Sequence, residues 1–243
     1  MKIGGLQKLT LVDYPGKVAA TVFLIGCNFR CPFCQNPELV DPEKIKNQPE
    51  ISEEQFFWFL DSEQGLLDGI CITGGEPTIH SDLIDFIKKI KDKGFLVKLD
   101  TNGSKPEVLS ELVDEKLIDF IAMDIKTSID VKIKNQKSKI KNYDIATEVN
   151  VDINKIKRSV ELIKNSGIDY EFRMTAVPGL VEKEDIEKIG KWLRGCKKFA
   201  LQQFQNKKVL DKEFEKIQPY SEETLKEFKK ILEKYIEKVE LRL

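Results

Sequence analysis

Short apolar runs alternate with helical patterns along almost the whole chain, and this alternation limits the fold more than any other feature. The runs are β-branched and apolar, as buried strands are, and occur at 18–25, 69–73, 95–100, 118–124, 170–177 and 199–204. Helical patterns occur at 52–60, 81–93, 106–116, 154–165, 182–193 and 221–237. Because strand–helix repetition of this regularity is typical of parallel βαβ units, the sequence predicts an α/β fold. Six units are too few to close an eight-stranded barrel.

Residues at the ends of the helical patterns support these boundaries. Ser81 and Ser221 precede apolar residues at helical spacing and are predicted N-caps. Gly94 and Gly167 are predicted to end the helices before them, as C-cap glycines do. The tail 238–243 alternates in polarity and predicts a short final strand.

One segment departs from the alternation. Residues 132–141 (KIKNQKSKIK) contain five lysines and little apolar content. We interpret this stretch as a solvated insertion in preference to a docking patch, because runs of like charge are usually solvated.

Composition limits the class of protein. The chain has 243 residues, 41% of them hydrophobic, which is enough for a sizeable core. Its net charge of −1 gives no global field that would favour nucleic acid or an anionic membrane as a partner. No stretch approaches 18 uncharged apolar residues, and the start of the sequence lacks the pattern of a signal peptide. We therefore expect a cytoplasmic protein without nucleic-acid or membrane partners.

Three of the five cysteines, Cys27, Cys31 and Cys34, are grouped in the run 26–36 (GCNFRCPFCQN). Thiolates are ligands that suit iron–sulfur clusters, zinc and copper(I). Structural zinc sites and electron-transfer cubanes normally take four protein ligands, so three on a four-iron cluster would leave one iron open. The run follows a predicted strand, where parallel α/β folds build their sites. Cys71 and Cys196 have no partners by spacing and are predicted core residues.

Polar and glycine-rich motifs follow other predicted strands in the same way. They are 74–77 (GGEP), 100–103 (DTNG) and 124–126 (DIK), and Arg173 lies within an otherwise apolar strand. Each has a plainer interpretation, as a turn, a surface pair or a structural ion pair. Their repeated position at the ends of parallel strands favours a common site. The only histidine, His80, is interpreted as a surface or capping residue.

These motifs together resemble the radical S-adenosylmethionine superfamily, whose hallmark is Cys-x3-Cys-x2-Cys with an aromatic residue, here Phe33, before the third cysteine. Residues 10–17 (TLVDYPGK) and 34–39 (CQNPEL) are similar to the glycyl-radical-enzyme activases, most of all to the activating proteins of anaerobic ribonucleoside-triphosphate reductase. The resemblance implies a partial (β/α)6 TIM-like barrel with an open parallel sheet, outer helices and a lateral cleft. It also implies one domain over residues 1–243, with a lysine-rich insertion at about 128–150.

The resemblance further implies cofactors and the residues that hold them. A [4Fe–4S] cluster on Cys27, Cys31 and Cys34 would chelate S-adenosylmethionine, and a monovalent cation on Asp100, Thr101 and Asp124 is expected near the cofactor carboxylate. Phe33 would flank the adenine. Gln202, Gln203 and Phe204 are expected to line the pocket, and Gln203 occupies roughly the place where relatives contact the ribose. The full set of implied cofactor-binding residues is Phe33, Gly74, Gly75, Glu76, Asp100, Asn102, Asp124, Lys126, Arg173 and Gln203.

The function implied is that of an enzyme that cleaves S-adenosylmethionine reductively to a 5′-deoxyadenosyl radical and generates a glycyl radical on a partner enzyme. The partner indicated is anaerobic ribonucleotide reductase, with flavodoxin or ferredoxin as electron donor. Two alternatives stay open. One is a radical enzyme acting on a small molecule, as 7-carboxy-7-deazaguanine synthase does, and the other is a non-catalytic iron–sulfur or zinc protein.

Overall fold

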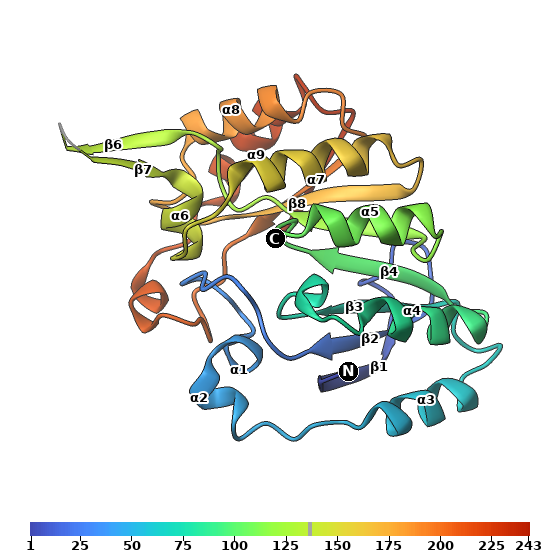
Figure 1. Ribbon diagram of the computed structural model, residues 1–243. Helices are drawn as coiled ribbons and strands as arrows, with labels where there is room; N and C mark the ends of the chain where they lie inside the picture. Colours follow the sequence, from blue (N-terminus) through green and yellow to red (C-terminus); the bar gives the residue numbers. More distant parts are fainter. Residues whose placement is uncertain (136–137) are drawn as a thin grey trace.

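A curved, open sheet forms the centre of the molecule. The computed structural model describes residues 1–135 and 138–243, with side chains described for 1–130 and 142–243. The described strands form an eight-stranded sheet in the order β1-β2-β3-β4-β5-β8-β9-β10 and a separate hairpin, β6–β7 (Figure 1). β1 pairs antiparallel with β2, and the other strands of the large sheet run parallel. Its strands are β1 Ile3–Thr10, β2 Ala19–Leu24, β3 Gly69–Gly74, β4 Leu96–Thr101, β5 Phe120–Asp124, β8 Asp169–Ala176, β9 Lys198–Gln203 and β10 Lys238–Arg242.

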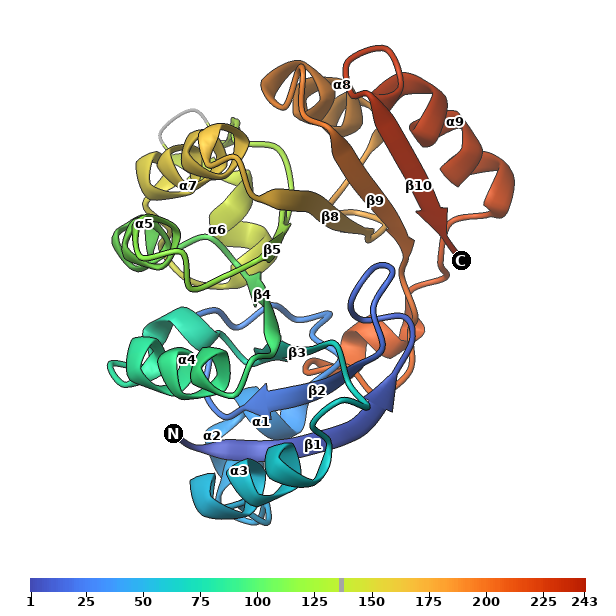
Figure 2. The same ribbon diagram turned by 90° about the vertical axis from the view of Figure 1, so that its right-hand side faces the viewer.

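Helices cover the convex outer face of this sheet (Figure 2). The longer ones are α3 Glu53–Ser62, α4 Leu83–Asp92, α5 Pro106–Asp114, α7 Ile153–Asn165, α8 Lys183–Trp192 and α9 Glu222–Leu232. Shorter ones are α1 Pro37–Val40, α2 Pro42–Ile45 and α6 Asn142–Thr147, with 3₁₀ turns at Pro77–Ile79 and Lys212–Lys216. None of the described helices is both long and apolar enough to cross a membrane.

The predicted α/β class, open parallel sheet and outer helices are confirmed. The six predicted strands are β2, β3, β4, β5, β8 and β9, and the predicted final strand is β10, which adds a further parallel strand at one end of the sheet. β1 and β10 lie at opposite ends and do not pair with each other, so the described sheet is open. β1 was not predicted, because its sequence IGGLQKLT is interrupted by glycines and polar residues.

The structure agrees with three of the four predicted helix boundaries. Gly94 and Gly167 follow their helices with φ of 84° and 77°, the left-handed conformation of a C-cap glycine. The Ser221 hydroxyl accepts a hydrogen bond from the Thr224 amide at 3.2 Å. The N-cap prediction for Ser81 is wrong. Helix α4 begins one residue later with Asp82 as N-cap, and that carboxylate pairs with the amino terminus of Met1 at 2.8 Å.

The two faces of the sheet are packed differently because side chains alternate along each strand. The outer face and the helices enclose the main apolar core. The inner, concave face surrounds a space that we call the lumen. A small apolar cluster, separate from the main core, lies in the lumen. It consists of Tyr14, Ala19, Phe120 and Ala122, and Leu96 packs against this cluster. Tyr14, from the loop between β1 and β2, is buried there with its ring 6.1 Å from that of Phe120.

The predicted insertion at 128–150 divides into two parts. Its first part forms the antiparallel hairpin β6 Val131–Asn135 and β7 Ser138–Lys141, which extends away from the sheet (Figure 1). Residues 136–137 and the lysine side chains lie outside the described residues, so their solvation stays a prediction. Helix α6, by contrast, is part of the packed structure, because Tyr143 and Ala146 are fully buried.

Candidate active site

The grouped cysteines and the strand-end motifs line one cavity of about 270 Å³. The cysteine loop follows β2, and the opposing residues come from the carboxyl ends of β3, β4, β5, β8 and β9. Predicted site residues on its wall are Cys27, Cys31, Phe33, Cys34, Gly74, Gly75, Glu76, Asp100, Thr101, Asn102, Asp124, Lys126 and Arg173. The structure therefore brings together all but one of the predicted cofactor-binding residues.

Gln203 is the exception. Its side chain donates a hydrogen bond to the Tyr220 carbonyl at 3.0 Å and is not part of the wall. The neighbouring Gln202 lines the cavity instead. Gln202 pairs in register with Thr175, which lies two residues beyond Arg173 on the same face of β8. Of the three residues 202–204 expected to line the pocket, strand alternation thus selects Gln202, and Gln203 and Phe204 are not on the wall.

The three thiols fit a cluster by the chemistry of their donor set. Burial raises the pKa of Cys27 to about 11 and that of Cys31 to about 12, so both are neutral thiols until a metal replaces the proton. The Phe29 amide donates to Cys27 Sγ at 3.3 Å, the kind of bond that tunes cluster thiolates. Among the described side chains, no three of Cys, His, Asp and Glu gather closely enough to hold a single metal ion.

The glycine motif after β3 holds the cysteine loop at close range. The Gly75 amide donates to the Leu24 carbonyl at 2.9 Å, and the Glu76 amide donates to the Gly26 carbonyl at 2.8 Å. A Cβ atom on Gly75 would lie 1.8 Å from the Gly26 oxygen. Only glycine permits this contact, so position 75 fixes the distance between the two loops.

Glu76 connects this motif to the end of β4. It is fully buried, and its carboxylate accepts hydrogen bonds from the Thr101 hydroxyl at 2.8 Å and the Asn102 amide at 2.6 Å. Thr78 donates to the same carboxylate through its amide at 3.1 Å and through its hydroxyl. Burial raises the pKa of Glu76 while these donors oppose that shift. The carboxyl group therefore organises two strand ends from inside the protein.

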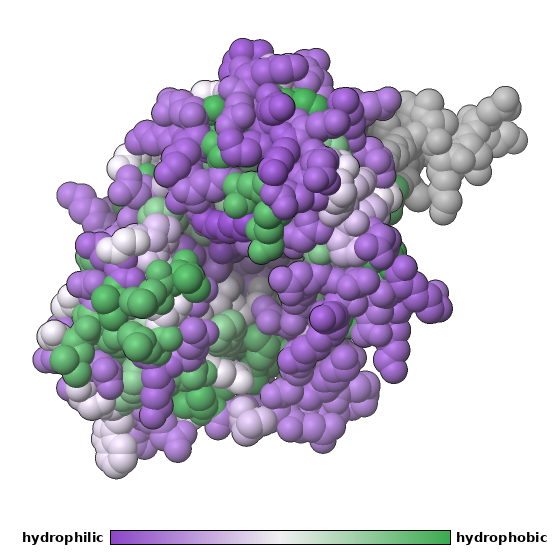
Figure 3. Space-filling view, turned by 180° about the vertical axis from the view of Figure 1, so that it is seen from behind, coloured by the Kyte–Doolittle hydropathy of each residue, from purple (hydrophilic) through white to green (hydrophobic). Residues whose placement is uncertain are grey.

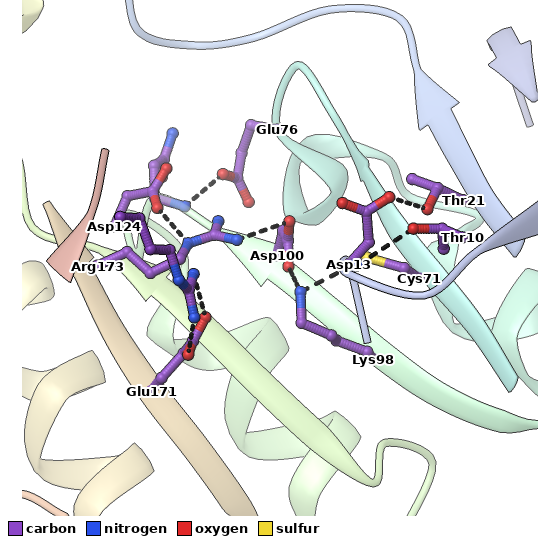
Figure 4. Close-up of polar contacts among 12 residues, drawn as sticks. Thr10, Asp13, Thr21, Cys71, Glu76, Lys98, Asp100, Asp124, Glu171 and Arg173 are labelled. Atoms are coloured by element: carbon purple, nitrogen blue, oxygen red, sulfur yellow. Dashed lines mark hydrogen bonds and ion pairs between the residues drawn. The ribbon is translucent and has the colours of Figure 1, made fainter. Parts of the chain in front are cut away.

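Charged side chains of alternating sign contact one another at the cavity wall (Figure 4). We call them the charged network; its members in order are Lys126, Asp124, Arg173, Asp100 and Lys98. Arg173 donates from Nε to Asp124 at 2.9 Å and from Nη1 to Asp100 at 3.0 Å. Lys126 pairs with the second oxygen of Asp124 at 3.0 Å, and Lys98 pairs with the second oxygen of Asp100. Burial would raise the carboxyl pKa values, but Arg173 and the lysines outweigh it and hold both below their usual range.

The charged network occupies the carboxylate ligands of the expected monovalent cation. Both carboxylates predicted to bind it already contact Arg173, and the Thr101 hydroxyl donates to Glu76 while accepting from the Gly103 amide at 3.1 Å. A cation at this point would have to displace the guanidinium of Arg173. The cation site stays a prediction.

Two supports of the site were not predicted from the sequence. The fully buried Tyr143 of α6 accepts a hydrogen bond at its hydroxyl from the Lys126 amide at 3.2 Å. The Thr147 carbonyl, at the end of α6, accepts one from the Arg30 amide of the cysteine loop at 2.9 Å. The lysine-rich composition of the preceding stretch concealed this helix.

His80 and Cys71 also differ from a simple surface or core residue. His80 ends the 3₁₀ turn Pro77–Ile79, as its capping interpretation predicts, and it is partly buried. Cys71 is fully buried as predicted, but it faces the lumen, with Sγ 3.6 Å from Lys98 Nζ.

Comparison with known proteins identifies the family. The profile of the radical SAM superfamily matches residues 21–193. A Methanocaldococcus jannaschii protein described as a glycyl-radical enzyme activating enzyme is 38% identical over 241 residues, covering 99% of this chain and 95% of that protein. The pyruvate formate-lyase-activating enzyme of Clostridium pasteurianum is 27% identical over 97% of this chain and 98% of its own length.

Solved structures show the same fold at low identity. Streptococcus suis SuiB bound to S-adenosylmethionine superposes with a TM-score of 0.62 at 14% identity, covering 91% of this chain and 51% of SuiB. The family profile and the two relatives agree with the three-cysteine motif, and the structural match agrees with the open parallel sheet described above. The chain therefore belongs to the radical S-adenosylmethionine superfamily, whose cofactors are a [4Fe–4S] cluster and S-adenosylmethionine, and within it to the glycyl-radical enzyme activating enzymes.

Proposed function

We propose that Cys27, Cys31 and Cys34 hold the [4Fe–4S] cluster and that this enzyme uses it to generate a glycyl radical on a partner protein. The main support for this proposal is that the three thiols, the glycine motif and members of the charged network line one cavity. When bound, the cluster supplies one electron, from an external donor, that cleaves S-adenosylmethionine to methionine and a 5′-deoxyadenosyl radical.

The residues of the chain would bind and orient the cofactor. Because an ammonium group can only donate hydrogen bonds, we assign the backbone carbonyls of this segment to the methionyl ammonium group. The Gly75 and Glu76 amides are bonded within the protein and hold the segment in place. Arg173 and Lys126 supply positive charge for the carboxylate. Phe33, buried on the wall, would pack against the adenine and keep water from the reacting atoms.

The substrate would be the α-carbon of a glycine in a protein. Apolar surface lies beside a hollow on the back of the molecule (Figure 3), and exposed large apolar side chains in the described part include Leu9, Leu11 and Val12. Exposed apolar surface of this kind favours a protein partner over a small molecule. The resemblance of residues 10–17 and 34–39 favours anaerobic ribonucleotide reductase as the partner, with flavodoxin or ferredoxin as donor.

Isotope transfer tests this proposal and the choice of partner. Purified anaerobic ribonucleotide reductase and pyruvate formate-lyase, each labelled with α-deuterated glycine, would be incubated separately with the reconstituted enzyme, reductant and S-adenosylmethionine. We expect deuterium in the 5′-deoxyadenosine formed with the reductase, measured by mass spectrometry. Transfer from the lyase alone would reassign the partner. Cofactor cleavage without transfer from either protein would contradict the reductase assignment and favour a small-molecule substrate.

A further inference from the structure

Lys98 is a buried charge whose role is not explained by the cavity itself. It lies on β4, two residues before Asp100, so both side chains face the lumen. The residue is 1% exposed, and burying an ammonium group is strongly unfavourable unless an ion pair offsets the loss of hydration. A leucine or valine would fill such a position at no comparable cost. A charge retained here therefore points to a function near the site.

The contacts of Lys98 connect it to the cavity wall through one residue. Its ammonium pairs with Asp100 Oδ1 and lies 3.6 Å from Cys71 Sγ (Figure 4). It is also 6.0 Å from the centre of the Phe120 ring. The other oxygen of Asp100 accepts from Arg173 Nη1. Lys98 thus fixes the orientation of Asp100 without itself lining the cavity.

The contact between Lys98 and Asp100 changes the net charge of the charged network. Lys98, Arg173 and Lys126 are cationic, and Asp100 and Asp124 are anionic, which leaves one positive charge in excess. Without Lys98, the two carboxylates would neutralise the two remaining cations. Within the described residues, no hydrogen bond engages Arg173 Nη2, whereas Nε and Nη1 each bind a carboxylate. One edge of the guanidinium therefore has a donor for an incoming anion.

We propose that Lys98 is a positioning residue that makes Arg173 available to the carboxylate of S-adenosylmethionine by neutralising Asp100. The inference rests on the proposed function only in placing the cofactor in this cavity. Lys98 would affect only the binding of the cofactor carboxylate, so recognition of the adenine and the sulfonium would be unchanged.

Equilibrium binding to the reconstituted enzyme tests it, with S-adenosylmethionine and its decarboxylated analogue as probes. Lys98→Met keeps the length of the side chain and removes its charge. We expect it to weaken S-adenosylmethionine binding about 10-fold and to change analogue binding less than about 2-fold. Lys198→Met is the matched control, because Lys198 faces the lumen from β9 but pairs with Glu171 and Glu240. Iron and sulfide content is measured for every variant.

A double variant separates positioning from a structural role and supplies the test if Lys98→Met does not fold. Lys98→Met combined with Asp100→Asn removes both members of the pair, so we expect S-adenosylmethionine binding no weaker than with Asp100→Asn alone. Equal weakening for both probes, no weakening in the single variant, or additive loss in the double variant would each overturn the role of Lys98. Failure of the wild-type enzyme to bind S-adenosylmethionine would instead refute the proposed function.

Discussion

Replacing Cys27, Cys31 or Cys34 with alanine is expected to reduce cleavage of S-adenosylmethionine to the background of cluster-free protein. Each thiol lines the same cavity, and no other cysteine is on its wall. Losing one of three thiolate ligands would leave two irons without protein ligands, so the cluster would not assemble in its active form. The measurement is 5′-deoxyadenosine formed under anaerobic reduction, with iron and sulfide determined on the same samples.

The other two cysteines provide the control. Cys71 faces the lumen beneath the cavity, and Cys196 is in the main core. Alanine at either position is expected to retain cluster content and cleavage within a few-fold of wild type, at a cost of about 1 kcal/mol in stability. Normal cleavage by any of the three cavity variants would refute the assignment of the cluster ligands.

Gly75→Ala is expected to have the second largest effect, a loss of about 100-fold in cofactor cleavage. The added Cβ would lie 1.8 Å from the Gly26 oxygen, so the cysteine loop and the glycine motif must separate. A displacement of about 1 Å at reacting groups can cost about 100-fold in rate. Cleavage is measured at saturating S-adenosylmethionine, and thermal unfolding is measured to confirm that the protein folds.

Gly5→Ala is the matched control for this substitution. Gly5 lies in β1, and a Cβ there would meet no atom closer than 3.5 Å, which is ordinary van der Waals contact. Its activity and unfolding temperature are expected to stay close to those of wild type. Equal activity of the Gly75 and Gly5 variants would show that the close contact between Gly26 and Gly75 does not position the site.

The parallel strands were predictable because their apolar runs are short, regular and separated by helical patterns. The gathering of the strand-end motifs was also predictable, because parallel strands bring their carboxyl ends to one side of the sheet. That rule placed Asp100 and Asp124 on a common wall, while Arg173, inside its strand, was assigned by the family resemblance. In the structure Arg173 contacts both carboxylates. The grouping of Cys27, Cys31 and Cys34 on one wall was predictable from their spacing.

Features that depend on tertiary packing were not predictable. β1 has no strong strand pattern of its own and forms because it can pair with β2 at the edge of the sheet. Tyr143 supports Lys126 from a helix that follows a lysine-rich stretch, so composition gave no indication of its burial. The choice between Gln202 and Gln203 depended on a one-residue register that flips a side chain to the opposite face.

The most direct test of the account is an anaerobic electron paramagnetic resonance spectrum of the reconstituted enzyme with reductant, S-adenosylmethionine and anaerobic ribonucleotide reductase. We expect a glycyl radical doublet on the reductase that is absent with the Cys34→Ala enzyme and present with the Cys71→Ala enzyme. If an enzyme with a complete cluster produced no doublet on either the reductase or pyruvate formate-lyase, that result would contradict the central claim.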